Sequence, residues 1–556
     1  MLKRTHANGT RGGSPRRGPW KKMLAVGFAA ALAGGGLTAC GGSDSGGSSD
    51  SVISTDASEP QNPLVTTNTN ENGGGRVLDE LYSGLVRYTS DGKTENAVAE
   101  SITPNADATE FTFKLRDWKF TNGEKVTSDS FIDAWNYGAA AKNAQLQADF
   151  FAPIKGYEEV SAPGSTKDKM SGLQKVSDTE FKVVLNAPES AFPDRLGHSP
   201  YMPLPKAAFQ DMKSFGEHPI GNGPYKLVDK EAWVHNQFIK LEANSDYPGP
   251  NKAKNGGIEF KIYNNLDTAY ADLQSNNLDI TYQTVPSSAM ATYRDDFPKS
   301  HSDSPFASIQ TFSIPSRLEH FGNDEEGKLR RQALSMAVNR KLITDKIFTG
   351  GRTPAKDFGA PTLGDGTPNI EGNDVLDYNA DKAKELWKKA DAIKPWSGTF
   401  EIAYNSDGGH KEWVEAVTND ISQNLGIEAH GKAYPTFKAL RDDVTKKTIS
   451  TAFRTGWQAD YPSIFNFLSP QYATDGPSND TQYSSKEFDD LLAKASAETD
   501  KAKAQKDYND AQAVLMKDLP AIPLWYYNAT DAWNEDLKGV KYNWKGAPVF
   551  TEIEKG

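Results

Sequence analysis

Two stretches of alternating apolar and polar residues predict half-buried β-strands. In "FTFKLRDWKF", at 111–120, and in "FKVVLNAP", at 181–188, every second residue at the start of the stretch is apolar. Between them, apolar residues recur at helical spacing from 131 to 138, shortly after a Thr-Ser pair at 127–128 of the kind that begins helices. The pattern therefore predicts a strand, a helix and a second strand in chain order.

Amphipathic patterns predict further helices in the second half of the chain, at 328–348, 381–390 and 485–519. In the first of these, the inner face is expected to comprise Leu329, Ala333, Leu334, Ala337, Val338, Ile343 and Ile347. The glycines of "PIGNGPYKLVD", at 219–229, lead into a strand, so they indicate a turn and not a phosphate-binding loop. Because strands and helices intermix throughout and no fixed-period repeat is present, the sequence predicts an α/β or α+β fold.

Length and composition indicate a soluble globular protein with more than one lobe. A chain of 556 residues is long for a single hydrophobic core. Hydrophobic residues make up 37% of the chain and charged residues 24%. Aromatic residues reach 10%, and we expect most of these rings to pack in the core, although such rings also line recognition surfaces.

The N-terminal residues 1–39 have the layout of a signal peptide. They carry seven basic residues and no acidic one, and the apolar run at 23–39 is too short and too rich in glycine to span a bilayer. The run ends in "LTAC", which resembles the bacterial lipobox, a motif in which cleavage precedes a lipid-modified cysteine. That residue would be Cys40, the only cysteine of the chain, and residues 40–52 would form the lipidated end and a flexible Gly/Ser tether.

The charge of the exported chain argues against nucleic acid as a partner. Removal of residues 1–39 would change the formal net charge from -12 to -19. An acidic protein held at the outer face of the cell membrane does not attract a polyanion. The pair Arg16-Arg17 would also suit twin-arginine export, but the residues around it fit that route poorly.

Motif searches give no support for catalysis, a metal or a cofactor. The eight histidines include no pair at a spacing of four residues. A thiolate metal site or a cysteine nucleophile is excluded if Cys40 carries lipid. Neither a G-x-S-x-G elbow nor a phosphate-binding Gly-Lys loop is present. We therefore expect a binding protein without a cofactor, not an enzyme.

The stretch "FRTGWQADYP", at 453–462, raises the question of what Asp460 contacts. An unpaired carboxylate among aromatic residues is costly because it loses hydration without compensation. Its partner could be Arg454, in an ion pair within the empty protein. It could also be the start of a helix near Pro462, or a cation that comes from outside. These residues alone do not separate the three possibilities.

Seven stretches, in order along the chain, resemble one family. They are "DELYSGLVRYTSDGKTENAVAESI", "TEFTFKLRDWKFTNGEKVTSDSFIDAWNYG", "GNGPYKL", "KLRRQALSMAVNRKLITDKIF", "YNADKAKELW", "RTGWQADYP" and "AIPLWYYN". Together they are similar to the solute-binding proteins of peptide ABC importers, family 5, which includes the oligopeptide- and dipeptide-binding class. The resemblance covers about residues 60–545. The lipobox and tether fit its Gram-positive or actinobacterial oligopeptide-binding branch.

The resemblance implies an α/β fold of the periplasmic-binding-protein type II (cluster C) class. Such a protein has three lobes, which form two halves that close on a ligand about a hinge. The expected boundaries are a discontinuous lobe I at 53–84, 206–307 and 528–556, lobe II at 85–205 and lobe III at 308–527.

The resemblance also implies a ligand site. In the oligopeptide branch an aspartate binds the α-ammonium of the peptide, and "GWQADY" matches it to Asp460. Further positions carried over from the family are backbone groups of Gly456 and Gln458, a pocket wall at Trp457, Arg454 and His410 near the peptide carboxylate, and Tyr282, Gln283, Asn70 and Glu71 around the cleft. Gln283 replaces the usual asparagine, and "TNTNENGGG" departs from the branch pattern around Asn70. Arg454 could instead form an ion pair with Asp460, and His410 could simply lie in a surface loop.

The sequence thus predicts a monomeric, lipid-anchored receptor that captures oligopeptides and delivers them to the permease of an ABC importer. Family members also bind dipeptides, nickel complexes or oligosaccharides, and Asp460 argues against a neutral sugar because a sugar supplies no ammonium. The sequence is also compatible with a sensory receptor that is not coupled to transport and with an extracellular hydrolase.

Overall fold

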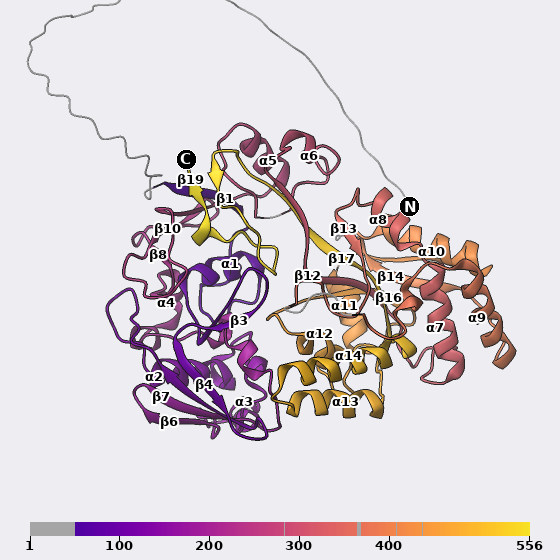
Figure 1. Cartoon of the computed structure of the whole chain (residues 1–556), viewed down its shortest axis with the longest axis horizontal. Coiled ribbons are helices and arrows are strands. Elements are labelled where there is room, and N and C mark those ends of the chain that lie inside the picture. Colours follow the sequence, from indigo (N-terminus) through magenta and orange to yellow (C-terminus); the bar gives the residue numbers. More distant parts are fainter. Residues whose placement is uncertain (1–50, 283, 364–368, 407–408, 436) are drawn as a thin grey trace, which may run out of the picture. The chain divides into compact units, whose positions relative to one another are not determined.

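The computed structural model describes residues 51–556 apart from 283, 364–368, 407–408 and 436, and these described residues belong to one compact unit, 47–556. The expected signal peptide, Cys40 and nearly all of the tether lie outside the described residues, as does Gln283. Three larger sheets organise the chain (Figure 1).

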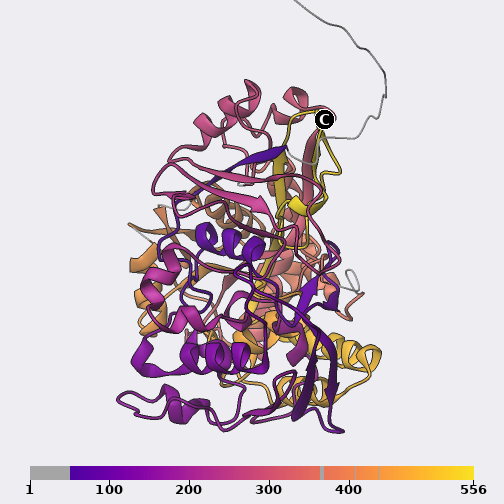
Figure 2. The ribbon, with the colours of Figure 1, turned by 90° about the vertical axis from the view of Figure 1, so that its left-hand side faces the viewer.

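The first sheet joins the start of the described chain to residues near its middle. Its order is β1-β11-β10-β8, with β9 beside β10, and β1 is parallel to β11 while β10 is antiparallel to its partners. The strands are β1 (Val52–Ala57), β8 (Tyr225–Leu227), β9 (Trp233–Val234), β10 (Phe238–Ala243) and β11 (Gly257–Ile262). The C-terminal residues return to this sheet, because Phe550 and Ile553 share a buried core with Ile53. Figure 2 shows this arrangement, with the yellow C-terminal segment beside the indigo strand β1.

The second sheet is antiparallel and contains the strands predicted from alternation. Its order is β4-β5-β7-β6, with β4 (Ala99–Pro104), β5 (Glu110–Leu115), β6 (Leu173–Ser177) and β7 (Glu180–Val184). Phe113 and Phe181 are fully buried and stack with their ring centroids 5.0 Å apart. Helix α2 (Ser128–Ala139) has Thr127 at its N-cap, as the sequence predicts.

The third sheet has the order β13-β17-β12-β16-β14-β15. Its strands are β12 (His301–Ser313), β13 (Arg352–Pro354), β14 (Phe400–Asn405), β15 (Ala429–Tyr434), β16 (Ala452–Gln458) and β17 (Ala521–Ala532). Helices pack around it: α7 (Glu325–Ala337), α8 (Arg340–Lys346), α9 (Ala380–Ile393), α10 (Lys411–Leu425), α11 (Phe437–Thr445), α12 (Ile464–Tyr472), α13 (Lys486–Ala497) and α14 (Lys501–Asp518). Two members of the expected inner face differ, since Leu329 is only partly buried and Ile347, at the end of α8, is 36% exposed.

Two long strands connect regions that the sequence assigns to different lobes. β12 and β17 pair antiparallel along their lengths, with irregular register between Pro305 and Ile309 and between Gln310 and Thr311. The expected boundaries at 307/308 and 527/528 therefore fall inside continuous strands. The division into three lobes stays an expectation.

The other α-helices and strands lie outside these three sheets. They are β2 (Val86–Tyr88), β3 (Thr94–Asn96), β18 (Leu537–Lys538), β19 (Glu554–Lys555), α1 (Asn72–Leu81), α3 (Tyr157–Ser161), α4 (Met212–Glu217), α5 (Leu266–Gln274) and α6 (Tyr293–Asp296). One face of α1 lines a cavity that is described below.

Candidate functional site

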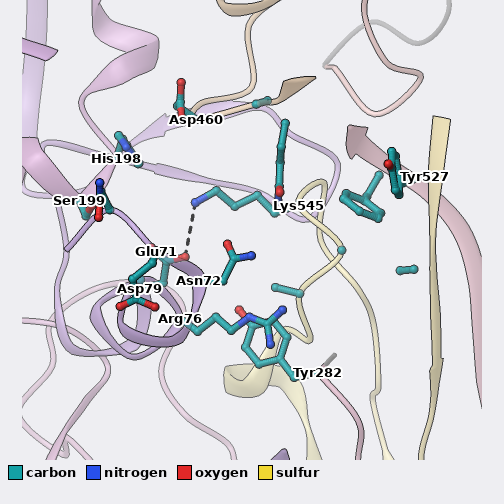
Figure 3. Close-up of a pocket in the computed structure, with 18 of the residues that line it drawn as sticks. Glu71, Asn72, Arg76, Asp79, His198, Ser199, Tyr282, Asp460, Tyr527 and Lys545 are labelled. Carbon is teal, nitrogen blue, oxygen red and sulfur yellow. Dashed lines mark hydrogen bonds and ion pairs between the residues drawn. The ribbon is translucent and has the colours of Figure 1, made fainter. Parts of the chain in front are cut away.

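A cavity of about 590 Å³ is lined by nine segments of the described chain, and its volume is within the range of small-molecule sites. The segments are 69–79 with helix α1, 146–150, 198–199, Tyr282 with Thr284, Phe306 in β12, Arg352 in β13, 458–460 after strand β16, 527–531 in β17, and 545–547. Figure 3 shows the side chains that point into it. We call this space the main cavity.

Asp460 lies in the main cavity at the connection between β16 and α12. It is not the helix cap, because Ser463 holds that position and its hydroxyl accepts a hydrogen bond from the backbone N–H of Phe465 at 3.3 Å. The capping interpretation of Asp460 is therefore wrong.

Asn466, in the first turn of α12, fixes the position of Asp460. The Asn466 side-chain amide donates to Oδ2 of Asp460 at 3.0 Å, and its Oδ1 accepts from the backbone N–H of Asp460 at 3.0 Å. Burial raises the pKa of the Asp460 carboxyl above its ordinary value, while the bond from Asn466 and the positive charge of Lys545 oppose this shift. The position of the carboxylate is thus fixed, but its contacts in the empty protein replace only part of the hydration that it loses on burial.

Arg454 does not pair with Asp460. Its Nε donates to Oδ1 of Asn405 at 2.8 Å, and its guanidinium lies 4.8 Å from the centroid of the Phe437 ring. Arg454 lines a second cavity of about 240 Å³, together with Gly456 and Trp457. The ion pair expected for the empty protein is therefore wrong, because the two side chains face different cavities along the same segment.

Trp457 and Gly456 both have structural roles at the second cavity. The indole N–H of Trp457 donates to Oδ1 of Asn466 at 3.0 Å, so the same amide holds Trp457 and Asp460. Gly456 is exposed and pairs with Gln310 of β12, and a Cβ atom added to Gly456 would lie 2.6 Å from the carbonyl oxygen of Ile309.

One edge of β16 remains open beyond its first residues. β14 pairs with β16 only at Ala452 and Phe453 among the described residues, whereas β12 pairs along 453–458 on the other side. The N–H of Ala459 bonds to Ala307 on the β12 side, and backbone groups alternate along an antiparallel strand. The backbone groups of Gly456 and Gln458 therefore point to the open edge. Gln458 also lines the main cavity.

Tyr282 lies in the main cavity with its ring almost completely buried. Its backbone N–H donates to Oδ1 of Asp56 at 2.6 Å, and its ring contacts Phe550 edge-on. The guanidinium of Arg76, on α1, lies over this ring at 4.0 Å from the centroid.

The remaining predicted residues have separate positions. Asn70 is exposed at the margin of the main cavity. Glu71 lines it too, but its carboxylate caps α1 by accepting from the N–H of Gly74 at 2.9 Å. His410 lies at the start of α10, where its Nδ1 accepts from the indole N–H of Trp413 at 3.1 Å, and it lines neither cavity.

A match to a protein-family model decides the class of this site. Residues 93–479 match the model described as "Bacterial extracellular solute-binding proteins, family 5 Middle". The chain belongs to this family. Its members are extracellular binding proteins, which confirms that the chain is not an enzyme.

Two similar proteins match this family 5 solute-binding protein over most of its length. The oligopeptide-binding protein OppA of Bacillus subtilis (strain 168) is 28% identical over 488 residues, which are 85% of this chain and 86% of OppA. The dipeptide-binding protein DppE of the same organism is 27% identical over 473 residues, 83% of this chain and 84% of DppE.

Solved structures confirm the expected fold class. The unliganded open form of the periplasmic murein tripeptide-binding protein MppA matches with a TM-score of 0.79 at 23% identity, over 91% of this chain and 98% of MppA. Haemophilus influenzae OppA in complex with the peptide RPPGFSPFR matches with a TM-score of 0.68 at 22% identity, over 92% of this chain and 100% of that one. None of the helices in the described part of this family 5 protein is long and apolar enough to cross a membrane.

Sequence reasoning missed most of the ionisable residues that line the main cavity, which include Arg76, Asp79, Asp149, His198, Arg352, Asp531 and Lys545. Nζ of Lys545 forms an ion pair with Asp79 at 3.5 Å, the interaction that the dashed line marks in Figure 3. Burial and the charge of Lys545 hold the pKa of His198 well below its usual range, so this imidazole is neutral. No sequence window signalled these residues, since only the fold brings them to Asp460.

Proposed function

We propose that this family 5 protein captures oligopeptides and delivers them to an ABC importer. The observation that carries the proposal is Asp460, a fixed and partly dehydrated carboxylate that faces the main cavity at the end of a strand with an open edge. A peptide α-ammonium would supply the missing positive charge. The names of the relatives, which include oligopeptide- and dipeptide-binding proteins, support the same ligand class.

The open edge of β16 gives the peptide a path. With its α-ammonium at Asp460, an extended peptide would hydrogen-bond to the backbone of Gln458 and Gly456 as an added strand. From Gln458 to Arg454 the strand advances roughly 13 Å at about 3.3 Å per residue, so the terminal carboxylate of a short peptide would come near Arg454 and the second cavity. Because such hydrogen bonds involve only the main chain of the peptide, they do not restrict its side chains, which suits a receptor for peptides of mixed sequence.

The remaining parts of the proposal concern location and partners. Cleavage before Cys40 and its lipidation would tether a monomeric receptor to the outer face of the membrane, next to the permease of the importer. The lipobox and tether favour the Gram-positive or actinobacterial branch of the family. Closure of lobe III on lobes I and II, about the strands β12 and β17, would enclose the peptide.

Peptide binding by the purified mature protein tests the proposal. Mass spectrometry of ligand released on denaturation should detect peptides. Isothermal titration should show binding of free-amino peptides, with N-acetylated versions of the same sequences bound much more weakly. Sugars or metal complexes in the released fraction, or equal binding of acetylated and free peptides, would contradict the proposed ligand class or the role of Asp460.

A further inference from the structure

Helix α1 presents one face to the main cavity. Asn72, Gly75, Arg76 and Asp79 line it, and these positions lie at the spacing of one helical face. Figure 3 shows Arg76 against the ring of Tyr282 at one end of the view and Asp460 at the other. The cavity is therefore lined by a guanidinium as well as by the carboxylate already discussed.

The guanidinium of Arg76 has a ring contact but no anion. Its carbon Cζ lies 4.0 Å from the centroid of the Tyr282 ring. Within the described residues, it forms neither a hydrogen bond nor an ion pair. Asp79, one turn further along α1, is already paired with Lys545 at 3.5 Å. A stacked guanidinium keeps its N–H groups free at the ring's edge, and their planar geometry matches a carboxylate.

The buried acids behind Tyr282 do not supply that anion. Asp531 is 2% exposed and accepts a hydrogen bond from the hydroxyl of Thr281 at 3.2 Å. Burial and the neighbouring Asp56 raise the pKa of Asp531 well above its usual range, while the bond from Thr281 and the positive charge of Arg76 oppose this shift. In the described part of the chain, no ion pair joins Asp531 to Arg76. A further acidic side chain, Asp149, lies near Asp460 and not near Arg76, and its negative charge raises the pKa of Asp460.

The main cavity thus has an acidic part around Asp460 and Asp149, and three cationic side chains also line it. Of these, Lys545 is paired with Asp79 and Arg352 donates to the carbonyl oxygen of Gly351 at 2.6 Å, so within the described residues Arg76 is the cation that has no hydrogen-bond or ion-pair partner. We propose that Arg76 binds a carboxylate of the ligand, so that the cavity selects peptides that carry an acidic group close to their amino terminus. This inference rests on the proposed peptide-binding function. The carboxylate could come from an acidic side chain or from the C-terminus of a very short peptide, and the chemistry at Arg76 is the same for both.

Matched peptides distinguish these sources. In the first arm, glutamate is compared with glutamine at positions 1, 2 and 3 of an otherwise all-alanine pentapeptide. In the second arm, trialanine is compared with its C-terminal amide. A charge-assisted bidentate contact predicts about ten- to a hundred-fold tighter binding of the acid in one of the arms.

The variant Arg76→Gln should abolish that ratio while it leaves the affinity for the glutamine or amide peptide almost unchanged. Arg76→Lys keeps the charge but not the planar fork, so it should retain only part of the ratio. Arg294→Gln is the matched control, since Arg294 is paired with Asp303 and lies outside the cavity. Thermal denaturation of each variant shows whether it is folded.

Three outcomes are informative. A preference in either arm that Arg76→Gln removes supports the inference and identifies the source of the carboxylate. Equal binding of acid and neutral peptides by the wild-type protein, or a preference that persists in Arg76→Gln, would overturn it while peptide binding stands. If the wild-type protein binds no free-amino peptide in either arm, the proposed function itself fails and the inference fails with it.

Discussion

Replacement of Asp460 by asparagine separates its charge from its shape. The side-chain amide of Asn466 can still donate to an asparagine oxygen at position 460, and the bond from the backbone N–H to Oδ1 of Asn466 is independent of the side chain. The substitution Asp460→Asn therefore removes one negative charge with little change in geometry. Any large effect on binding reports the charge.

The expected loss of affinity follows from the surroundings of the carboxylate. Hydrogen bonds to charged groups contribute about 1.5–3 kcal/mol, and removal of one member of a buried ion pair costs about 3–5 kcal/mol. Asp460 is only partly buried in the empty cavity. We therefore expect Asp460→Asn to weaken binding of free-amino peptides by about 2–4 kcal/mol, or roughly thirty- to several-hundred-fold.

The same substitution, Asp460→Asn, should stabilise the empty protein although it weakens peptide binding. Because burial raises the pKa of Asp460 in the folded state, the folded protein holds this proton more tightly than the unfolded chain does. The ionised carboxylate consequently destabilises the empty protein at pH values above the raised pKa, and the effect disappears as the pH falls below the unfolded value. Asp460→Asn should then raise the melting temperature of the empty protein at neutral pH but not at strongly acidic pH.

Isothermal titration with one peptide in free-amino and N-acetylated forms measures the binding effect, and thermal denaturation across pH measures the stability effect. Asp303→Asn is the matched control, because Asp303 is paired with Arg294 outside the main cavity. Equal losses for both peptide forms, or an equal loss in Asp303→Asn, would refute the ammonium assignment. A lower melting temperature for Asp460→Asn at neutral pH would refute the stability argument.

Three further predictions concern different parts of the chain. Cys40→Ser should release the protein from membranes into the soluble fraction, and unchanged retention after fractionation would contradict lipid anchoring. Since Lys545 lowers the pKa of Asp460, Lys545→Met should move the loss of peptide affinity at acidic pH to a higher pH, and an unmoved binding profile would contradict this electrostatic link. Gly456→Ala should lower stability by about 1–3 kcal/mol in denaturant titrations, because its Cβ would collide with the carbonyl oxygen of Ile309, and an unchanged midpoint would show that the strands yield easily.

Local pattern predicted the elements better than it predicted their ends. Alternation identified β5 and β7 because their buried rings face one side of a sheet at every second residue. The helical spacing at 328–348 predicted helices, but it did not show where the break falls: α7 ends at Ala337 and α8 begins at Arg340. Ile347 looked internal because it continues the apolar spacing, but the last turn of α8 leaves it exposed.

The candidate site was predictable only where its residues belong to a recognisable stretch. Asp460, Gln458 and Tyr282 were selected from the sequence and do line the main cavity. Arg454 was selected from the same stretch as Asp460, yet it belongs to the second cavity, and proximity in sequence gave the wrong partner. Arg76 comes from a distant segment and carries no motif, so only the fold relates it to Asp460.

The connection between β16 and α12 explains how one aspartate can remain available for a ligand. The helix needs an oxygen acceptor at its start, and Ser463 supplies it, so the carboxylate of Asp460 is not consumed by capping. Asn466, itself 3% exposed, orients both Asp460 and Trp457 from the first turn of the helix. An ionised carboxylate accepts about four hydrogen bonds, and Asn466 uses one. The other acceptor positions of the Asp460 carboxylate face the cavity. An ammonium group, which has three donors, would fill most of them.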